Sequence, residues 1–268
     1  MQADQIFDHL WSDYIKQNPE VKRVYDSFIS AGEEVVNDHI AFRTFDHERI
    51  NIDKLARVFL QAGYVPKGEY YFEEKKLFAR HYELPGKSEA PRVFISELQL
   101  DKCSSWLKQE ITQMIDALPE GLEHEDDLIY KGGVFGLPSY ELYKKLREES
   151  EYAAWVYVYG FRANHFTVSV NHLKSMKSLQ AVNEFLKGNG FILNSSGGEI
   201  KGNPLEFLEQ SSTMAGHLDV EFAEGTYRIP SCYYEFALRY KMEDGELYSG
   251  FIAKSADKIF ESTNFYSS

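Results

Sequence analysis

The stretch DHIAFRTF at residues 38–45 decides the fold, because a similar stretch, ANHFTVSVN, returns at residues 163–171. Both stretches alternate polar and apolar residues with a period of two, as strands with one buried face do. Each also carries a histidine near its start, His39 in the first and His165 in the second. The sequence therefore predicts two equivalent strands, each of which opens one half of the chain.

The residues that follow these two strands are also alike. In the first half a helical pattern leads to Phe59-Leu60 and then to Gly63-Tyr64-Val65, and in the second half to Phe185-Leu186 and then to Gly190-Phe191-Ile192. A glycine at this point is typical of a helix C-terminal cap. Each half then reads as strand, helix and about three strands, and such order at a fixed spacing indicates an internal duplication.

The predicted fold class is α+β, with two βαβββ modules whose curved sheets form a cup and with extra helices around them. We expect one domain over residues 1–268, divided into N-terminal helices 1–36, a first module at about 37–100, a helical connection at about 101–160 and a second module at about 161–264. Two such sheets that face each other would bring the first strands of both modules together. His39 and His165 are therefore expected to lie close together.

Hydrophobic periodicity and turn residues give the remaining elements. Helices are expected at 3–17, 19–31, 52–63, 104–118, 139–157 and 175–190. Further strands are expected at 64–72, 76–84 and 92–100 in the first module, and near 191–194, 217–223, 230–240 and 247–253 in the second.

Composition argues against several classes of partner. The formal net charge is −13 and Lys and Arg form no long run, so neither nucleic acid nor an anionic membrane is an expected partner. The two cysteines, Cys103 and Cys232, do not make a disulfide framework. The sequence shows no secretory signal and no apolar stretch of membrane-spanning length, so we expect a cytoplasmic protein. It leaves the oligomeric state open.

Three of the predicted strands carry polar residues on one face and apolar residues on the other. His39 and Arg43 share a face of the first strand, and His165 lies on the polar face of its counterpart. In SCYYEFALR, residues 231–239, the polar face carries Glu235 and Arg239. A carboxylate in such an aromatic strand is costly to bury without a cation.

Two imidazoles and one carboxylate are the ligand set typical of non-heme iron(II), and they leave about three coordination positions open. We therefore predict that His39, His165 and Glu235 bind Fe(II); zinc, manganese, cobalt and nickel are also compatible with this set. Glu97 lies in the last strand of the first half, as Glu235 does in the second, and is a possible fourth ligand. The alternatives are that each histidine is a hydrogen-bonded core residue and that Glu235 only pairs with Arg239 or Arg228.

Four stretches together resemble a known family: HIAFRT (39–44), ANHFTV (163–168), SCYYEFALR (231–239) and KSADKIFES (254–262). They are similar to the 2-oxoadipate dioxygenase/decarboxylases, also called hydroxyglutarate synthases, over residues from about 35 to 264. The chain looks like a short form of that family. The resemblance implies a vicinal-oxygen-chelate core and places the family's metal ligands at His39, His165 and Glu235.

The resemblance also implies the chemistry. A 2-oxo diacid such as 2-oxoadipate and dioxygen would give 2-hydroxyglutarate and carbon dioxide, with Arg43 as the catalytic residue that binds a substrate carboxylate. The family's substrate-contacting Val-Ser pair falls on Lys254 and Ser255, so that lysine replaces valine here. This departure puts the preferred chain length of the substrate in doubt.

Three other functions remain compatible with the sequence. An isomerase, lyase or hydrolase of the same fold would use zinc or manganese with an activated water. A non-enzymatic protein that binds a small molecule would hold no metal. A purely structural protein would leave the polar cup without a ligand.

Overall fold

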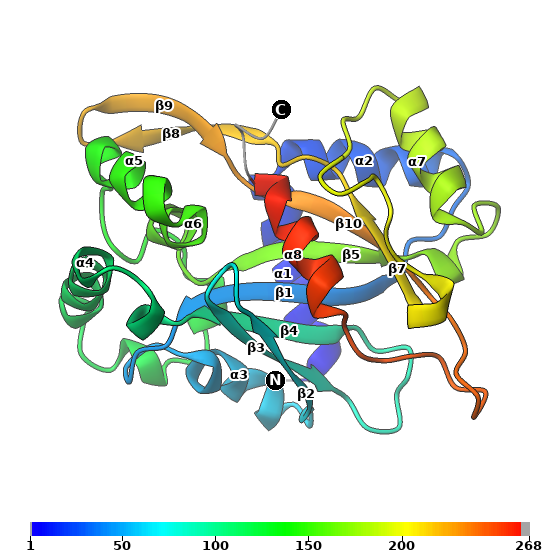
Figure 1. The fold of residues 1–268 in the computed structure, drawn as a ribbon, viewed down its shortest axis with the longest axis horizontal. Coiled ribbons are helices and arrows are strands. Elements are labelled where there is room, and N and C mark those ends of the chain that lie inside the picture. Colours follow the sequence, from blue (N-terminus) through cyan, green and yellow to red (C-terminus); the bar gives the residue numbers. More distant parts are fainter. Residues whose placement is uncertain (1, 264–268) are drawn as a thin grey trace.

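The computed structural model describes residues 2–263, apart from the side chains of residues 256 and 257. These residues form a curled eight-stranded sheet in the order β2-β3-β4-β1-β5-β10-β7-β6, together with a separate β8–β9 hairpin. The strands of the sheet are β1 (Asn37–Phe45), β2 (Val65–Phe72), β3 (Leu77–Glu83), β4 (Arg92–Leu98), β5 (Ala163–Ser169), β6 (Lys201–Asn203), β7 (Leu208–Ser212) and β10 (Tyr233–Arg239). Figure 1 shows how the sheet curls around its concave face.

The two modules repeat the same strand arrangement. In the first module β1 is parallel to β4, and in the second β5 is parallel to β10. The structure confirms the α+β fold with duplicated modules but corrects one expectation. The modules do not form two separate facing sheets, because β1 and β5 pair with each other in antiparallel register and join them into one sheet.

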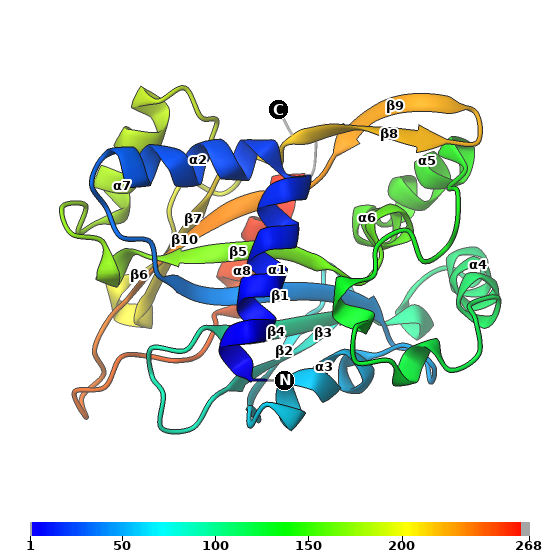
Figure 2. The ribbon, with the colours of Figure 1, turned by 180° about the vertical axis from the view of Figure 1, so that it is seen from behind.

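The helices are α1 (Ala3–Gln17), α2 (Pro19–Ser30), α3 (Ile52–Gln61), α4 (Ser105–Asp116), α5 (Tyr140–Glu149), α6 (Glu151–Tyr159), α7 (Leu179–Gly188) and α8 (Ala253–Phe260). Seen from behind, α1 and α2 cross the convex face of the sheet (Figure 2). The apolar faces of the strands meet them there: Trp11 of α1 packs edge-on against Phe166 of β5, and the ring of Phe28 of α2 packs at a tilt against Phe236 of β10. Because side chains alternate along a strand, the other face of each strand points to the concave side of the sheet.

The predicted helix at 139–157 is two helices, because the chain turns at Ser150. This residue has an extended backbone (φ −148°, ψ 103°), and its side chain accepts a hydrogen bond from the backbone N–H of Ala153. Ser150 therefore caps α6, whose described residues from Tyr152 to Tyr159 are all buried. The turn lays the aromatic residues of α6 beside the end of β1.

One strand prediction in the second module is wrong, and another is right but lies outside the sheet. Residues 191–194 form no strand, and the module uses β6 and β7 instead. The strand predicted at 217–223 is present as β8 (His217–Phe222), but it pairs with β9 (Gly225–Pro230) in a separate hairpin. The sequences of β6 and β7, KGN and LEQSS, are short and polar, so they lack the alternation that reveals a strand. Gly202 is needed in β6, because a Cβ there would lie 2.2 Å from the carbonyl oxygen of Leu208.

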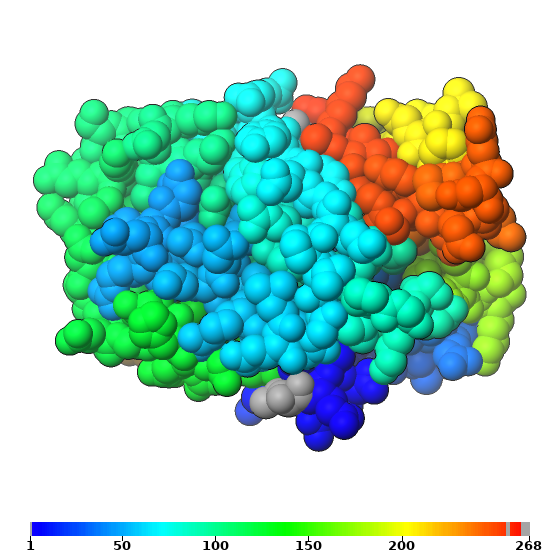
Figure 3. All heavy atoms as spheres, turned by 90° about the horizontal axis from the view of Figure 1, so that it is seen from below, coloured from blue at the N-terminus to red at the C-terminus, as the bar shows by residue number. Residues whose placement is uncertain are grey.

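The predicted strand at 247–253 is also wrong. Residues 248–252, which we call the covering segment, cross to the concave face and lead into α8. This helix contacts both edge strands of the sheet, β2 and β6, and lies in front of the central strands in Figure 1. Viewed from below, the orange and red C-terminal chain fills the space beside the β2–β3 hairpin (Figure 3).

Candidate metal centre

Three side chains on the concave face bring their ligand atoms together. Atoms of His39, His165 and Glu235 all lie within 4.8 Å of one another, and all three residues are buried. The Nε2 atom of His39 lies 3.5 Å from one oxygen of the Glu235 carboxylate, and the Nε2 atom of His165 lies 3.3 Å from the other. The predicted set of three is therefore assembled in space, although its members come from distant parts of the chain.

Strand register explains this proximity. Thr167 of β5 lies opposite His39 of β1 on one side and opposite Glu235 of β10 on the other. His165 is two residues before Thr167 and so projects from the same face of β5. The junction between the two modules thus places both histidines and the carboxylate around one point.

Each histidine is oriented by the residue that precedes it. The Nδ1 atom of His39 lies 2.8 Å from Oδ1 of Asp38, and the Nδ1 atom of His165 lies 3.0 Å from Oδ1 of Asn164. These contacts leave both Nε2 atoms facing Glu235. A histidine that binds a metal usually donates its other ring N–H in this way, which fixes its tautomer and orientation.

Burial also sets the charges of the three groups. It lowers the pKa of His39 and, further, that of His165, so both imidazoles are neutral and can offer a lone pair. Burial raises the pKa of Glu235 to about 8, although Gln210 donates a hydrogen bond to this carboxylate. A divalent cation between the three groups would offset the cost of the buried carboxylate. The donor set therefore fits a metal ion.

Arg43 lies on the concave face further along β1, with an exposed fraction of 1%. Its guanidinium carbon lies 5.0 Å from the ring centre of Tyr152, 5.3 Å from Trp155 and 5.7 Å from Phe260. Within the described residues, its Nε and Nη1 atoms have no hydrogen-bond partner. A cavity of about 180 Å³ borders this side chain. Arg43 is thus a buried cation with free donors, which suits an anionic ligand.

Arg239 also lies on the concave face, where it is engaged by protein groups. Its Nε and Nη2 atoms donate to the two carboxylate oxygens of Asp38 at 2.7 and 2.9 Å. Its Nη1 atom donates to the backbone oxygens of Tyr248 and Gly250 in the covering segment. Arg239 therefore links the carboxylate that orients His39 to the segment that covers the site.

The structure does not bring Glu97 to the cluster. Glu97 pairs with Thr44 in the β1–β4 register, and its carboxylate accepts a hydrogen bond from the backbone N–H of Ile52 at the start of α3. The residue of β4 that corresponds to Glu235 is Phe94, which lies opposite Ala41 as Glu235 lies opposite Thr167. The expectation failed because strand order alone does not give the register.

Lys254 and Ser255 both lie in the first turn of α8, not in a strand. Lys254 is exposed, whereas Ser255 is buried near Gly202 of the edge strand β6. The substrate-binding roles of both residues stay predictions.

Sequence reasoning missed several residues beside the cluster. Asp38, Asn164 and Gln210 hydrogen-bond the three candidate ligands. Phe251 of the covering segment packs edge-on against His39, with ring centres 4.8 Å apart, and shields this imidazole from water. The repeated order of an Asp or Asn before each histidine was a signal for the first two. Gln210 lies in a strand without a readable pattern.

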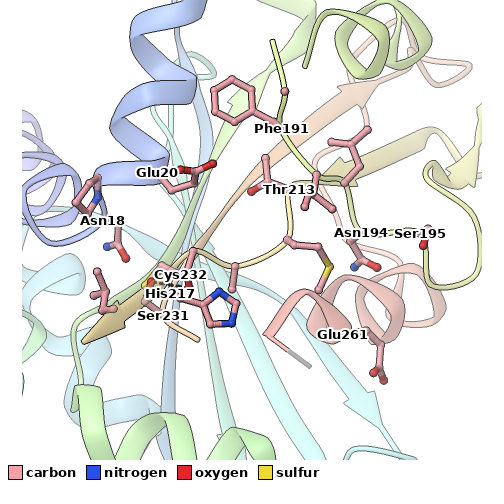
Figure 4. A pocket seen from close by; sticks show the side chains of 18 of the residues that line it. Asn18, Glu20, Phe191, Asn194, Ser195, Thr213, His217, Ser231, Cys232 and Glu261 are labelled. Carbon is pink, nitrogen blue, oxygen red and sulfur yellow. Dashed lines mark hydrogen bonds between the residues drawn. The ribbon is translucent and has the colours of Figure 1, made fainter. Parts of the chain in front are cut away.

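A larger cavity, of about 660 Å³, lies elsewhere. Figure 4 shows Asn18 and Glu20 from the α1–α2 junction on one side of it and Glu261, beyond the end of α8, on another. None of the three clustered residues lines it. Its size alone does not make it the reactive site, because the convergent ligand atoms lie on the concave face.

Comparison with known proteins places the chain in a family. The sequence profile of the 2-oxoadipate dioxygenase/decarboxylases matches residues 5–123 and 135–245. An Arabidopsis thaliana relative named as a chloroplastic 2-oxoadipate dioxygenase/decarboxylase is 38% identical over 93% of this chain and 74% of its own length.

Solved structures agree with this result. Hydroxyglutarate synthase from Oryza sativa, solved with 2-oxoadipate, has a TM-score of 0.89 and 36% identity over 98% of this chain and 93% of that chain. A Shewanella frigidimarina protein, provisionally described as a hydrolase, has a TM-score of 0.87 and 46% identity over 94% and 98% of the two chains.

A protein of Ralstonia eutropha assigned to the glyoxalase superfamily shares the fold, with a TM-score of 0.74 at 18% identity over 93% of this chain and 85% of that chain.

Within residues 2–263, no helix is both long enough and apolar enough to cross a membrane. Motifs, fold and sequence matches agree, and the chain belongs to the 2-oxoadipate dioxygenase/decarboxylase family.

Proposed function

We propose that this protein is a metal-dependent dioxygenase/decarboxylase that converts a 2-oxo diacid, with 2-oxoadipate as the first candidate, to a hydroxy acid and carbon dioxide. For 2-oxoadipate the product would be 2-hydroxyglutarate. Family membership and the Oryza sativa structure with 2-oxoadipate support this substrate class. The observation that carries the proposal is the buried cluster of His39, His165 and Glu235 on the same concave face as Arg43, whose Nε and Nη1 atoms lack a hydrogen-bond partner within the described residues.

His39, His165 and Glu235 would hold the metal ion, and iron(II) is the metal we propose. When bound, such an ion supplies oxygen activation and a chelation site for the two adjacent oxygens of a 2-oxo acid. Asp38 and Asn164 hold the two imidazoles in the orientation that ligation needs. Glu235 supplies the negative charge that partly neutralises the cation.

Arg43 would bind the carboxylate at the far end of the diacid. This carboxylate stays ionised at neutral pH and cannot enter an apolar site without a cation. The rings of Tyr152, Trp155 and Phe260 surround the guanidinium, so water competes little for its donors. Phe251 and α8 cover the concave face and exclude water from the bound substrate.

Metal content and oxygen uptake test the proposal together. Protein purified without oxygen should contain one iron per chain, and its oxygen consumption should rise with C4 to C7 2-oxo diacids. Turnover under strict anaerobiosis, or only with zinc, would instead support an isomerase, lyase or hydrolase of the same fold. Protein that binds 2-oxo acids but no metal would be a sequestering protein.

Three further properties stay proposals. Lys254 is exposed in the first turn of α8, and we propose that it shifts the preferred chain length by adding a positive charge where the family has valine. Dioxygen is the proposed co-substrate. The cytoplasmic location stays a prediction, as does the folding of residues 1–268 as one domain.

A further inference from the structure

Tyr233 is a polar residue of the concave face that the proposed chemistry has not yet used. It lies in β10, two residues before Glu235, and pairs with His165 in the parallel register. Its ring stacks on the His165 imidazole, with ring centres 4.7 Å apart and planes 27° apart. It also packs against Ala215 and against Ile259 of α8, so it is enclosed between the sheet and that helix.

The hydroxyl group of Tyr233 has no hydrogen-bond partner within the described residues, although the side chain is fully buried. A buried phenol is normally hydrogen-bonded, because leaving its donor and acceptor unmet costs free energy. Such an orphaned group at a reactive site indicates a missing partner. A ligand on the concave face is the natural candidate for this partner, because the Tyr233 ring lies against His165 of the metal cluster.

Arg43 is the charge with the strongest influence on this phenol, ahead of Glu235 and Glu151. Arg43 likewise acts on His165. Tyr233 therefore stacks on a histidine of the metal cluster and lies within electrostatic range of Arg43. A ligand that chelates a metal at the cluster and reaches toward Arg43 with its far end would lie near the Tyr233 side chain.

We propose that the Tyr233 hydroxyl donates a hydrogen bond to the far carboxylate of the 2-oxo diacid, so that Tyr233 and Arg43 form one anion subsite. This inference rests on the proposed function and adds a second specificity residue to it. A guanidinium and a phenol offer donors of different direction, which together fix a carboxylate more tightly than the cation alone. The subsite would select diacids over 2-oxo acids that end in a methyl group.

The chain offers a matched control in the next residue. Tyr234 is also fully buried, and its hydroxyl also lacks a partner within the described residues, but its side chain lies on the convex face against Trp11. Tyr233→Phe and Tyr234→Phe therefore remove the same atom from the same strand on opposite faces. Each change removes one oxygen atom that makes no hydrogen bond within the described residues, so both variants should retain the melting temperature and metal content of the wild type.

Binding is measured by calorimetry on protein loaded with Zn(II), so that no oxygen chemistry interferes. The ligands are 2-oxoadipate and 2-oxohexanoate, which has the same chain without the far carboxylate. Tyr233→Phe should weaken 2-oxoadipate binding about 10- to 100-fold, as expected for loss of a hydrogen bond to a charged group, and leave 2-oxohexanoate binding within about threefold. Tyr234→Phe should change neither.

Equal binding of 2-oxoadipate by both variants would overturn the inference and leave the proposed function standing. An equal loss for both ligands in Tyr233→Phe would overturn it too, because the hydroxyl would then contact the chelating end. A wild-type protein that binds neither ligand with Zn(II) bound would contradict the subsite and the proposed function together.

Discussion

At the residue scale, the cluster consists of three side chains that neighbouring residues hold in the orientation needed to bind a cation. His39 and His165 are neutral because burial lowers their pKa, and burial raises the pKa of Glu235 to about 8. Replacing any one of the three by alanine should reduce bound metal to below one tenth of the wild-type content, while circular dichroism stays unchanged. His172→Ala is the control, since that exposed histidine contacts Glu89 and Ser169 and lies outside the cluster. Full metal content in all three variants would contradict the assignment.

Arg43→Lys separates substrate binding from metal binding. Lysine keeps the positive charge but loses the two-pronged geometry that matches a carboxylate. We expect full metal content and a loss of kcat/KM of about 10- to 100-fold, as for a lost hydrogen bond between charged groups. Arg80→Lys, in an ion pair with Glu69 at the surface, is the control. Steady-state rates with metal quantified in each sample decide the question, and wild-type kcat/KM in Arg43→Lys would show that Arg43 binds no substrate carboxylate.

The buried carboxyl group of Glu97 should make the stability of the fold depend on pH, independently of any metal. Burial raises its pKa to about 7 from its ordinary value of 4.5, so the folded state holds the proton more tightly than the unfolded state. Glu97 therefore destabilises the fold progressively as pH rises from about 4.5 to 7. Glu97→Gln should stabilise the protein by about 1–2 kcal/mol at pH 8, allowing for partial solvent screening, and by almost nothing at pH 4. Urea unfolding of metal-free protein at both pH values measures this, and loss of metal binding in the variant would restore Glu97 as a ligand.

At the element scale, the covering segment and the first strand are tied together by one side chain. Arg239 binds Asp38, which orients His39, and also two backbone oxygens of residues 248–250. Arg239→Lys cannot make all four hydrogen bonds, so we expect a loss of about 1–3 kcal/mol in stability and about 10- to 100-fold in metal affinity. Arg228→Lys, on the exposed β9 strand, should change neither quantity. An unchanged metal affinity in Arg239→Lys would show that Asp38 does not need this partner.

The elements that could be predicted from sequence are those whose residues sort by polarity onto two faces. In the strands that carry His39, His165 and Glu235, the face that packs on helices is mainly apolar and the face that lines the site carries the ligands, although both faces are buried. By contrast, β6 and β7 are short, polar strands held by pairing with their neighbours, and no local pattern reveals them. The covering segment was mistaken for a strand because its aromatic residues suit a sheet, although Phe251 is buried against His39 instead.

At the scale of the whole molecule, the duplication explains how the candidate site forms. The antiparallel contact between β1 and β5 sets His39 beside His165, and the parallel partner of β5 adds Glu235. The first module has Phe94 at the position that corresponds to Glu235, so of these two equivalent positions only the one in the second module supplies a carboxylate to the cluster. The sequence repeat could predict the pair of histidines. It could not predict that Glu97 faces α3, because only the register decides which residues of two strands are equivalent.

The central claim is that a 2-oxo diacid is decarboxylated and hydroxylated at the metal held by His39, His165 and Glu235. The most direct test is a single-vessel measurement of oxygen consumed, carbon dioxide released and product mass from 2-oxoadipate, using ¹⁸O₂ and protein loaded with iron(II). We expect equal amounts of oxygen consumed and carbon dioxide released, and 2-hydroxyglutarate that carries both atoms of ¹⁸O₂, one in the new hydroxyl group and one in the carboxylate formed at the former keto carbon. Product formed without oxygen consumption, or a hydroxy acid that carries no label, would contradict it.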